Sequence, residues 1–419
     1  MTSNIGTLEL ARHAKATSRI LATAPTAQRN AAIRAIAKIV REERIAIAGS
    51  NVEDLAQAKH NGVSQPLQDR LRLGEKDIER MCIAAEAVAS LPDPIGEVTG
   101  LTQQPSGIRV GRMRIPLGVL GMIYESRPNV TLEAASLGIK SGNACVLRGG
   151  SEAIRSNCAI ADCVSRGLEE AGLPASVVQL VRTTDRAAVG ELLAADEFID
   201  LIIPRGGKGL VERVSHESAI PVLKHLDGIC HVYIDDSADV DMAIDIAINS
   251  KAEKYAVCNA VETILVSARK AQEILPRLIQ QFDDLGVEAR GCNRTRTIVP
   301  NVAAATEEDW GEEYLDAIVA VKVVDDLEEA IAHINHFGSG HTDTIVATDI
   351  DTAQQFVNRV DSATVMVNTS TQFADGFEFG LGAEIGISTD KLHARGPVGL
   401  EGLTTQKFVV YSDGAIRHR

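Results

Sequence analysis

The sequence predicts an α/β protein in which two doubly wound parallel sheets are accompanied by a small β element. Short apolar segments alternate with helical ones from Gly118 to Ile203, and the alternation starts again at His231. Before the first sheet, residues 98–115 instead alternate apolar residues with arginines, as in a β-hairpin. The chain has 419 residues, which is more than a single hydrophobic core normally serves, so we expect more than one domain.

The N-terminal part is predicted to be helical and the next segment to be a hairpin. Over residues 7–90, apolar side chains recur three or four positions apart. A Pro105-Ser106-Gly107 turn then joins predicted strands at 98–101 and 108–114. Two strands are rarely stable alone, so we expect this hairpin, together with a last strand at 406–411, to pack on another subunit.

The first sheet is predicted to carry two phosphate-type turns. Its strands are expected at 118–123, 144–147, 177–181 and 199–203, with helices at 134–140, 153–171 and 186–195. Arg148-Gly149-Gly150 follows the second strand, and Arg205-Gly206-Gly207-Lys208-Gly209 follows the fourth. Ligands of parallel sheets bind beyond the carboxyl ends of the strands, where backbone N–H groups and a cation suit a phosphate. For each turn alone, a tight bend with a surface cation is the alternative.

The second sheet is predicted to present a cysteine. Its strands are expected at 231–234, 262–266, 319–324 and 344–348, with helices at 240–249, 270–282 and 327–337 and a glycine-rich loop at 373–402. Cys258 falls between a helix and a strand, where a scaffold can present one reactive side chain. A thiol there can act as a covalent nucleophile if its thiolate is stabilised. The alternative is a small apolar filler, because cysteine is often buried.

Composition excludes several function classes. A net charge of −15 argues against binding a nucleic-acid backbone, and 3% aromatic residues argue against a platform for single strands. The sequence contains no apolar run of membrane-spanning length and no secretory start, so we expect a cytoplasmic protein. The seven cysteines include no CxxC pair, and the histidine pairs 225/231 and 333/336 have no further ligands at metal spacing. The sequence therefore predicts no metal site.

Several of these segments resemble the aldehyde dehydrogenase superfamily, over nearly the whole chain. Residues 116–123 are similar to the strand that enters its cofactor domain, and Cys258 falls where its nucleophile does. Glu312-Glu313 resembles the glutamate pair whose second member holds the nicotinamide ribose, and Phe379-Gly380 fits the apolar substrate loop. The resemblance implies an aldehyde-dehydrogenase-like fold: a doubly wound Rossmann-type cofactor domain, an α/β catalytic domain and a small β oligomerisation element.

Three segments resemble, more narrowly, the γ-glutamyl phosphate reductase branch of that superfamily: 124–130, 225–233 and 257–260. Oxidising members carry an asparagine where Ser126 falls, and a general-base glutamate where this chain reads Lys224-His225-Leu226-Asp227-Gly228. An enzyme that hydrolyses its thioester needs a base to activate water, whereas one that reduces the thioester does not. The missing glutamate therefore favours reduction, although Asp227 or His225 stays open as an alternative base.

The resemblance implies NADPH-dependent reduction of γ-glutamyl phosphate to L-glutamate 5-semialdehyde, with release of phosphate, in proline biosynthesis. Cys258 would carry the acyl group as a thioester, and its backbone N–H with Asn129 or Ser126 would hold the oxyanion. Arg127 is the candidate for the leaving phosphate, since a guanidinium can bind it through two hydrogen bonds. A structural ion pair is the alternative role for Arg127.

The cofactor is expected to bind at Arg148, Gly149, Gly206, Gly207 and Lys208, with Glu313 at the nicotinamide ribose. Arg148 aligns with a lysine that oxidising relatives use near the adenosine ribose. A guanidinium there could pair with the 2′-phosphate of NADPH, and Lys208 could share that role.

The expected domains are residues 1–97 with 116–230 for the cofactor, 231–395 for catalysis, and 98–115 with 396–419 for oligomerisation. Expected partners are the small-molecule substrate, further copies of the chain and, as a candidate, glutamate 5-kinase. Two other function classes stay open. One is an oxidising, hydrolytic aldehyde dehydrogenase, and the other is a non-catalytic partner subunit of a kinase that forms an acyl phosphate.

Overall fold

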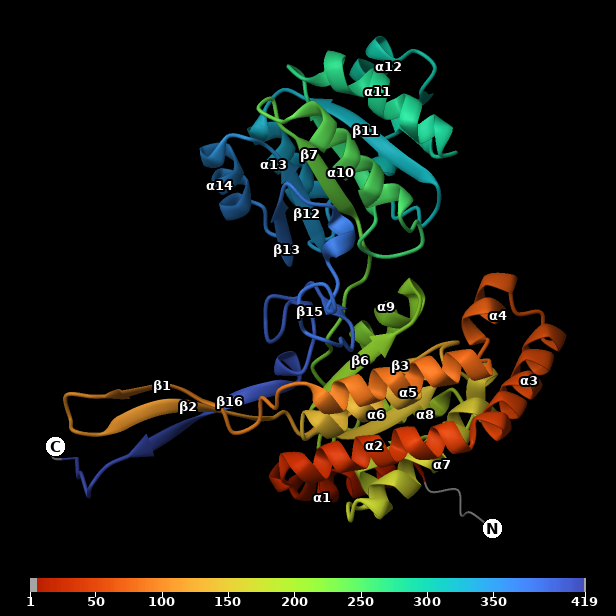
Figure 1. Cartoon of the computed structure of the whole chain (residues 1–419), viewed down its shortest axis with the longest axis vertical. Coiled ribbons are helices and arrows are strands. Elements are labelled where there is room, and N and C mark those ends of the chain that lie inside the picture. The colour runs from red at the N-terminus through yellow and green to blue at the C-terminus, as the bar shows by residue number, and fades with distance from the viewer. Residues whose placement is uncertain (1–5, 418–419) are drawn as a thin grey trace. The chain divides into compact units, whose positions relative to one another are not determined.

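The computed structural model describes residues 6–417, and its contacts divide the chain into two compact units (Figure 1). Unit 1 comprises the chain up to Lys224, Leu381–Gly386 and the residues from Val398 onward. Unit 2 comprises His225–Gly380 and Ile387–Pro397. Each unit contains a parallel sheet with helices packed on it, so the predicted α/β class is confirmed. Within residues 6–417, none of the helices has both the length and the apolar content needed to cross a membrane.

Unit 1 contains a four-stranded parallel sheet in the order β5-β4-β3-β6. The sheet strands are β3 (Val119–Tyr124), β4 (Ala144–Gly149), β5 (Val178–Leu180) and β6 (Leu201–Arg205). The helices are α1 (Thr7–Thr23), α2 (Thr26–Glu42), α3 (Arg44–His60), α4 (Gln65–Leu71), α5 (Glu75–Ser90), α6 (Asn129–Lys140), α7 (Ile154–Glu170), α8 (Ala187–Leu193) and α9 (Lys208–Glu217). Three short 3-10 turns complete it: η1 (Ser151–Ala153), η2 (Ala175–Val177) and η5 (Glu401–Leu403).

The strand order of unit 1 reverses at β3, and this reversal positions the site. The chain moves outward from β3 to β4 and β5 and then returns to place β6 on the other side of β3. One core cluster joins α1, α8 and α9 to this sheet through residues such as Ala14, Leu192 and Val214. The connections that follow β3 and β6 leave toward opposite faces of the sheet. The carboxyl ends of these two strands therefore form the crevice where such sheets bind ligands.

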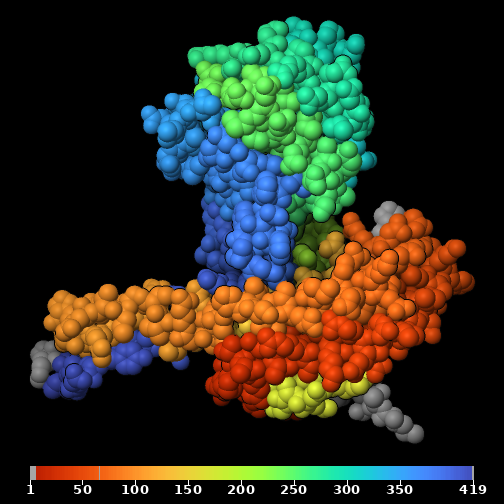
Figure 2. Space-filling view, viewed as in Figure 1, coloured from red at the N-terminus to blue at the C-terminus, as the bar shows by residue number. Residues whose placement is uncertain are grey.

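An arm of three antiparallel strands belongs to unit 1. It consists of β1 (Val98–Gln103), β2 (Arg109–Pro116) and β16 (Thr404–Tyr411), with β2 in the middle. Figure 2 shows the hairpin in orange and the C-terminal strand in blue, side by side along the arm. β1 is exposed along its whole length, and Phe408 and Val410 of β16 are exposed too. The predicted hairpin of β1 and β2 is therefore present, and β16 pairs with β2 as a third strand.

Unit 2 contains a seven-stranded parallel sheet in the order β10-β9-β11-β8-β7-β12-β13. Its strands are β7 (Cys230–Ile234), β8 (Val261–Ser267), β9 (Glu288–Gly291), β10 (Ala303–Ala304), β11 (Ile318–Val324), β12 (Thr342–Val346) and β13 (Thr364–Val367). Its helices are α10 (Val240–Ala252), α11 (Ala271–Asp284), α12 (Asn293–Ile298), α13 (Leu327–Phe337) and α14 (Ile350–Arg359). A two-stranded ribbon of β14 (Ile387–Ser388) and β15 (Gly396–Pro397) and two 3-10 turns, η3 (Glu308–Gly311) and η4 (Thr371–Phe373), complete it.

Successive strand residues of unit 2 face opposite helix layers. Val232 and Ile234 of β7 join the core beneath α10 and α11, whereas Tyr233 between them joins the core beneath α13 and α14. A strand covered on both faces is apolar at nearly every position. Continuous runs of apolar residues of this kind predicted β7, β8 and β11. The helices and strands absent from the predicted set are short or carry few buried apolar residues: α9, α12, α14, β9, β10, β13, β14 and β15.

A fully buried ion pair brackets the loop that carries Cys258. Lys251 lies in the last turn of α10 and Glu262 in β8, and the Lys251 Nζ donates to Glu262 Oε2 at 2.6 Å. The backbone N–H of Leu315 donates to the other carboxylate oxygen at 3.4 Å. Burial raises the pKa of Glu262 and lowers that of Lys251, and the partner's charge opposes the shift in each case. The pair therefore fixes both ends of the loop, because separating the charges would leave each one buried alone.

Lys251→Met should destabilise the protein by about 3–5 kcal/mol, since it leaves a carboxyl group buried without its cation. The double variant Lys251→Met/Glu262→Gln should recover most of this loss, because a neutral amide still accepts from Leu315. Denaturant unfolding of the two variants measures the difference. Equal losses in the single and double variants would contradict the account.

Candidate active site

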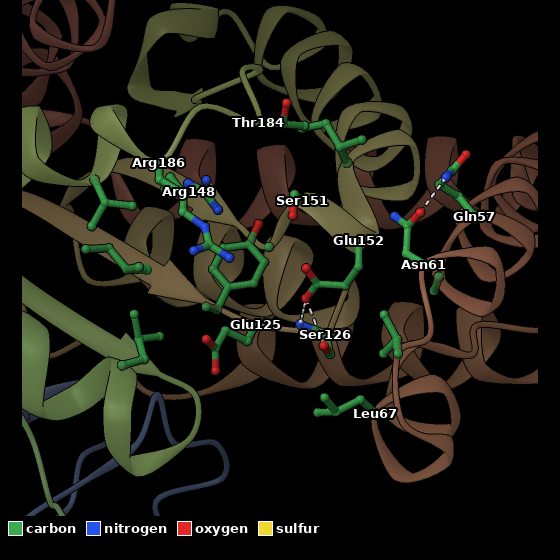
Figure 3. Close-up of a pocket in the computed structure, with 18 of the residues that line it drawn as sticks. Gln57, Asn61, Leu67, Glu125, Ser126, Arg148, Ser151, Glu152, Thr184 and Arg186 are labelled. Carbon is green, nitrogen blue, oxygen red and sulfur yellow. Dashed lines mark hydrogen bonds between the residues drawn. The ribbon is translucent and has the colours of Figure 1, made fainter.

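The carboxyl edge of the unit 1 sheet opens into a large cavity. Its volume is about 1010 Å³, and its lining includes Tyr124 and Glu125 after β3, Arg148 at the end of β4 and Leu210 at the start of α9 (Figure 3). The cavity thus lies at the strand-order reversal, where the predicted phosphate-type turns also lie. Its size is at the upper end of the range for small-molecule and cofactor sites.

Glycines at this edge allow close approach of neighbouring groups. A Cβ on Gly149 would overlap the Asn157 side chain, and one on Gly206 would overlap the carboxylate of Glu125. The Gly207 N–H donates to Glu125 Oε2 at 3.1 Å, immediately before α9 begins at Lys208. This helix N-terminus therefore already holds an anionic group, as expected for a phosphate-type turn.

Arg148 is buried in the cavity wall. Its Nη1 donates to the Gly149 carbonyl at 2.6 Å and its Nη2 to the Asp185 carbonyl at 3.4 Å, while its Nε has no hydrogen-bond partner among the described residues. Burial lowers the pKa of Arg148, and the nearby cations Arg186 and Arg213 lower it further. Both of those arginines also line the cavity. Their role at the cavity was not predicted from the sequence, because they lie in segments that only the fold brings beside β4.

Ser126, Arg127 and Asn129 lie in the connection from β3 into α6. Ser126 is buried with a positive φ of 44°, and its backbone N–H and hydroxyl both donate to Glu152 Oε1, at 2.7 and 2.8 Å (Figure 3). Asn129 is the first residue of α6 and is half-buried. Burial raises the pKa of Glu133 on α6, and the charges of Arg205 and Arg127 oppose that rise. Arg127 therefore has a carboxyl neighbour, and its structural role stays open beside phosphate binding.

In unit 2, Cys258 lies at the amino edge of the sheet, just before β8 begins. The chain at Gly228 approaches it so closely that a Cβ on Gly228 would lie 2.6 Å from the Cys258 Cα. The Gly228 N–H donates to Glu313 Oε1 at 2.8 Å, and the Cys230 thiol donates to the Cys258 carbonyl at 3.2 Å. Cys258 and Glu313, both predicted site residues, therefore contact the same segment, residues 228–230. These contacts hold the Cys258 backbone in place.

Two histidines accompany the Cys258 thiol. One ring nitrogen each of His225 and His341 and the Cys258 Sγ lie within 4.8 Å of one another. Burial, together with the neighbouring His225, lowers the pKa of His341 to about 3, so this ring is neutral. His231, which the sequence paired with His225, instead contacts Asp343 at 2.8 Å. Sequence spacing could not reveal this group, because its members precede three different strands that only the parallel sheet aligns.

A second cavity of about 530 Å³ lies beside the Cys258 loop. Val257 and Asn259, the neighbours of Cys258, line it together with Lys254, Gln372 and three residues of the predicted glycine-rich loop, Phe373, Asp375 and Glu378. Asn259 is held by the carbonyls of Gln372 and Ala374, to which its Nδ2 donates at 3.0 and 3.3 Å. Phe379 and Gly380 close the next turn, where the Phe379 N–H donates to the Asp375 carbonyl.

The predicted site residues thus form two groups, each within one unit. The carboxyl edge of unit 1 carries Ser126, Arg127, Asn129, Arg148, Gly149, Gly206, Gly207 and Lys208. Unit 2 carries Cys258, Glu313, Phe379 and Gly380. The first group suits a phosphorylated ligand, and the second can carry out chemistry at a thiol.

Comparison with known proteins gives consistent matches. The sequence profile of the aldehyde dehydrogenase family matches residues 7–309 and 288–382. The solved structure of γ-glutamyl phosphate reductase from Thermotoga maritima is 45% identical, with a TM-score of 0.97 and coverage of 99% of this chain and 100% of that one. The Saccharomyces cerevisiae γ-glutamyl phosphate reductase is 31% identical over 100% of both chains, with a TM-score of 0.55. An acetylating aldehyde dehydrogenase from Geobacillus thermoglucosidasius shares the fold at 19% identity, a TM-score of 0.67 and coverage of 99% and 98%.

Gly228→Ala should destabilise the protein by about 1–3 kcal/mol, because the added methyl group forces the Cys258 backbone to move. It should also change the rate at which iodoacetamide alkylates Cys258, measured by peptide mass spectrometry. Gly190→Ala on α8 is the matched control: its Cβ meets open space, so the helix should gain about 0.5–1 kcal/mol. Similar behaviour of the two variants would show that the close approach does not matter.

Proposed function

The chain belongs to the aldehyde dehydrogenase family, and from this premise we propose that it reduces γ-glutamyl phosphate to L-glutamate 5-semialdehyde with release of phosphate. The observation that carries the proposal is the full-length match, at 45% identity, to a protein of that name. The segment at Lys224–Gly228 agrees with it, because the hydrolytic base glutamate of oxidising members is missing there. The reaction is the reductive step of proline biosynthesis.

The chemistry assigned to the chain begins at Cys258. Its thiolate attacks the γ-acyl carbon, and the bond between that carbon and the phosphate oxygen breaks. Phosphate departs, and the acyl group remains on the sulfur as a thioester. His225 is only half-buried and is the ring suited to take the thiol proton, whereas neutral His341 adds no competing charge. Of the two side chains expected to donate to the oxyanion, we favour Asn129, because both donors of Ser126 are engaged by Glu152.

The unit 1 cavity fits a nicotinamide cofactor. The unpartnered Nε of Arg148 and the glycines whose Cβ atoms would not fit support a dinucleotide beside the backbone. When bound, the cofactor supplies the hydride that reduces the thioester. We assign Arg148 to the 2′-phosphate of NADPH, with Arg186, Arg213 and Lys208 as further cations, and Glu313 to the nicotinamide ribose. Unit 1 is then the cofactor unit and unit 2 the catalytic unit.

The unit 2 cavity suits the amino-acid end of the substrate. Asp375 and Glu378 offer carboxylates for an α-ammonium group, and Lys254 offers a cation for an α-carboxylate. Arg127 keeps its proposed role toward the leaving phosphate. Phe379 and Gly380 belong to the turn that positions this wall.

The setting of the enzyme follows from its chemistry. A reactive thiol requires a reducing compartment, so we assign the protein to the cytoplasm. An acyl phosphate hydrolyses readily, and a kinase such as glutamate 5-kinase must supply it. We assign the arm of β1, β2 and β16 to homo-oligomer formation, because it exposes apolar side chains such as Leu101, Phe408 and Val410.

Cys258→Ala should abolish turnover while leaving the unfolding transition of the protein unchanged. Wild-type enzyme given γ-glutamyl phosphate without reduced cofactor should gain the mass of one glutamyl group, and peptide mapping should locate it on Cys258. Glutamylation of Cys230 or Cys292 would contradict the assignment.

Arg148→Ala should raise the KM for NADPH more than that for NADH, with little change in kcat, because the contact is equal in the ground and transition states. One charge-assisted contact is worth about 1.5–3 kcal/mol, or roughly ten- to 150-fold. The matched control is Arg166→Ala, because Arg166 is an exposed arginine of α7 that pairs with Glu43 outside the cavity, and its loss should leave both KM values unchanged. Arg186 and Arg213 should soften the effect of Arg148→Ala. Equal losses with both cofactors would make Arg148 structural.

Deleting residues 101–112 should give a smaller species by light scattering, because the arm loses its exposed tip. Val410→Glu tests the same surface with one substitution, since Val410 is 56% exposed on β16. Unchanged mass for both variants would exclude the arm as a subunit contact.

A further inference from the structure

The group of His225, Cys258 and His341 has the composition of a transition-metal site. One nitrogen from each ring and the thiol sulfur lie within 4.8 Å of one another. Two nitrogens and one sulfur form a donor set that Zn²⁺ prefers, whereas Mg²⁺ and Ca²⁺ prefer oxygen. The donors come from segments ahead of β7, β8 and β12, three neighbouring strands of one sheet. The scaffold therefore fixes the backbone positions of all three.

Hydrogen bonds orient both rings so that one nitrogen carries a lone pair. The His225 Nδ1 lies 3.2 Å from the Ile387 carbonyl, which can only accept, so the proton of the neutral ring is on Nδ1. The His341 Nδ1 lies 2.8 Å from the Thr342 hydroxyl, and its Nε2 is buried without a hydrogen-bond partner among the described residues. Metal-binding histidines are typically held in this way, with the second nitrogen bonded to a protein oxygen. When the Nδ1–H of His341 donates to the Thr342 hydroxyl, the buried Nε2 presents a lone pair that a metal would bind.

The distances require only a small adjustment. Tetrahedral zinc with Zn–N near 2.0 Å and Zn–S near 2.3 Å sets two nitrogens and one sulfur about 3.3–3.5 Å apart. A contraction of up to about 1.5 Å is within reach of side-chain rotation, since Cys258 and His225 are half-buried. Their partial exposure also gives the ion a path from solvent and leaves room for water as the fourth ligand.

We propose that His225, Cys258 and His341 form a reversible inhibitory site for Zn²⁺ or a similar thiophilic divalent cation. Binding replaces the S–H bond of Cys258 by a metal–thiolate bond and releases one proton to solvent, with no change of oxidation state. A sulfur whose lone pair is shared with the ion cannot attack an acyl carbon. The inhibitory part rests on the proposed function, whereas the binding part does not.

Cobalt(II) is the probe, because a thiolate–cobalt bond gives a charge-transfer band and tetrahedral cobalt gives intense d–d bands. Titration of the full-length protein under reducing conditions should show both bands at one cobalt per chain, and Zn²⁺ should remove them. Cys258→Ala should abolish the charge-transfer band, and His341→Gln and His225→Gln should each weaken binding at least about tenfold. Cys292→Ala is the matched control, a half-buried thiol beside Thr295 whose loss should leave the titration unchanged.

The outcomes separate this inference from the proposed function. A charge-transfer band that persists in Cys258→Ala, bands that vanish in Cys292→Ala, or no bands in the wild type would overturn the site. If His341→Gln fails to fold, by circular dichroism, His225→Gln decides. Zn²⁺ should inhibit turnover over the same concentration range in which it displaces cobalt, and a chelator should restore activity. Metal binding without any reductase activity would refute the function and leave the site standing, whereas activity that Zn²⁺ does not affect would refute the inhibition.

Discussion

The close approach of two backbone segments at Gly228 and Cys258 is the constraint on which the catalytic unit depends. No side chain larger than hydrogen fits at position 228 without displacing Cys258. Glu313 holds this segment from one side, and the Cys230 thiol bonds the Cys258 carbonyl from the other. Beneath them, the Lys251–Glu262 pair fixes both ends of the loop. Cys258, the proposed nucleophile, therefore sits on a backbone with little freedom to move, which is how a scaffold pre-organises a reacting group.

The two units use opposite edges of their sheets. Unit 1 follows the usual rule, with its cavity beyond the carboxyl ends of β3, β4 and β6. Unit 2 collects His225, Cys258 and His341 ahead of the amino ends of β7, β8 and β12. Parallel strands make both arrangements possible, because every strand of a sheet begins at one edge and ends at the other. A phosphate-type cradle and a thiol site are thus built by the same architecture.

The sequence predicted much of the fold because buried parallel strands are apolar at nearly every position, as in β3, β7 and β8. It missed β13 and α14, because β13 is only four residues long and α14 is short, with Ala353 and Phe356 as its buried residues. For the site, glycine and cation patterns located Arg148 and Gly206, and the resemblance located Cys258. Arg186, Arg213 and His341 were missed, because they reach their neighbours only through strand order. The engagement of Ser126 by Glu152 depends on a positive φ that no sequence pattern showed.

The central claim is that Cys258 exchanges an acyl group with phosphate, not with water. Its most direct test runs the reaction in reverse, with L-glutamate 5-semialdehyde and NADP⁺, and follows the absorbance of the reduced cofactor with and without inorganic phosphate. Repeated turnover to NADPH should require phosphate, at a rate that saturates with its concentration, and without phosphate at most one NADPH per active site should form. Equal formation without phosphate would contradict the central claim and indicate a hydrolytic dehydrogenase, and no formation under either condition would indicate a chain that does not catalyse this reaction.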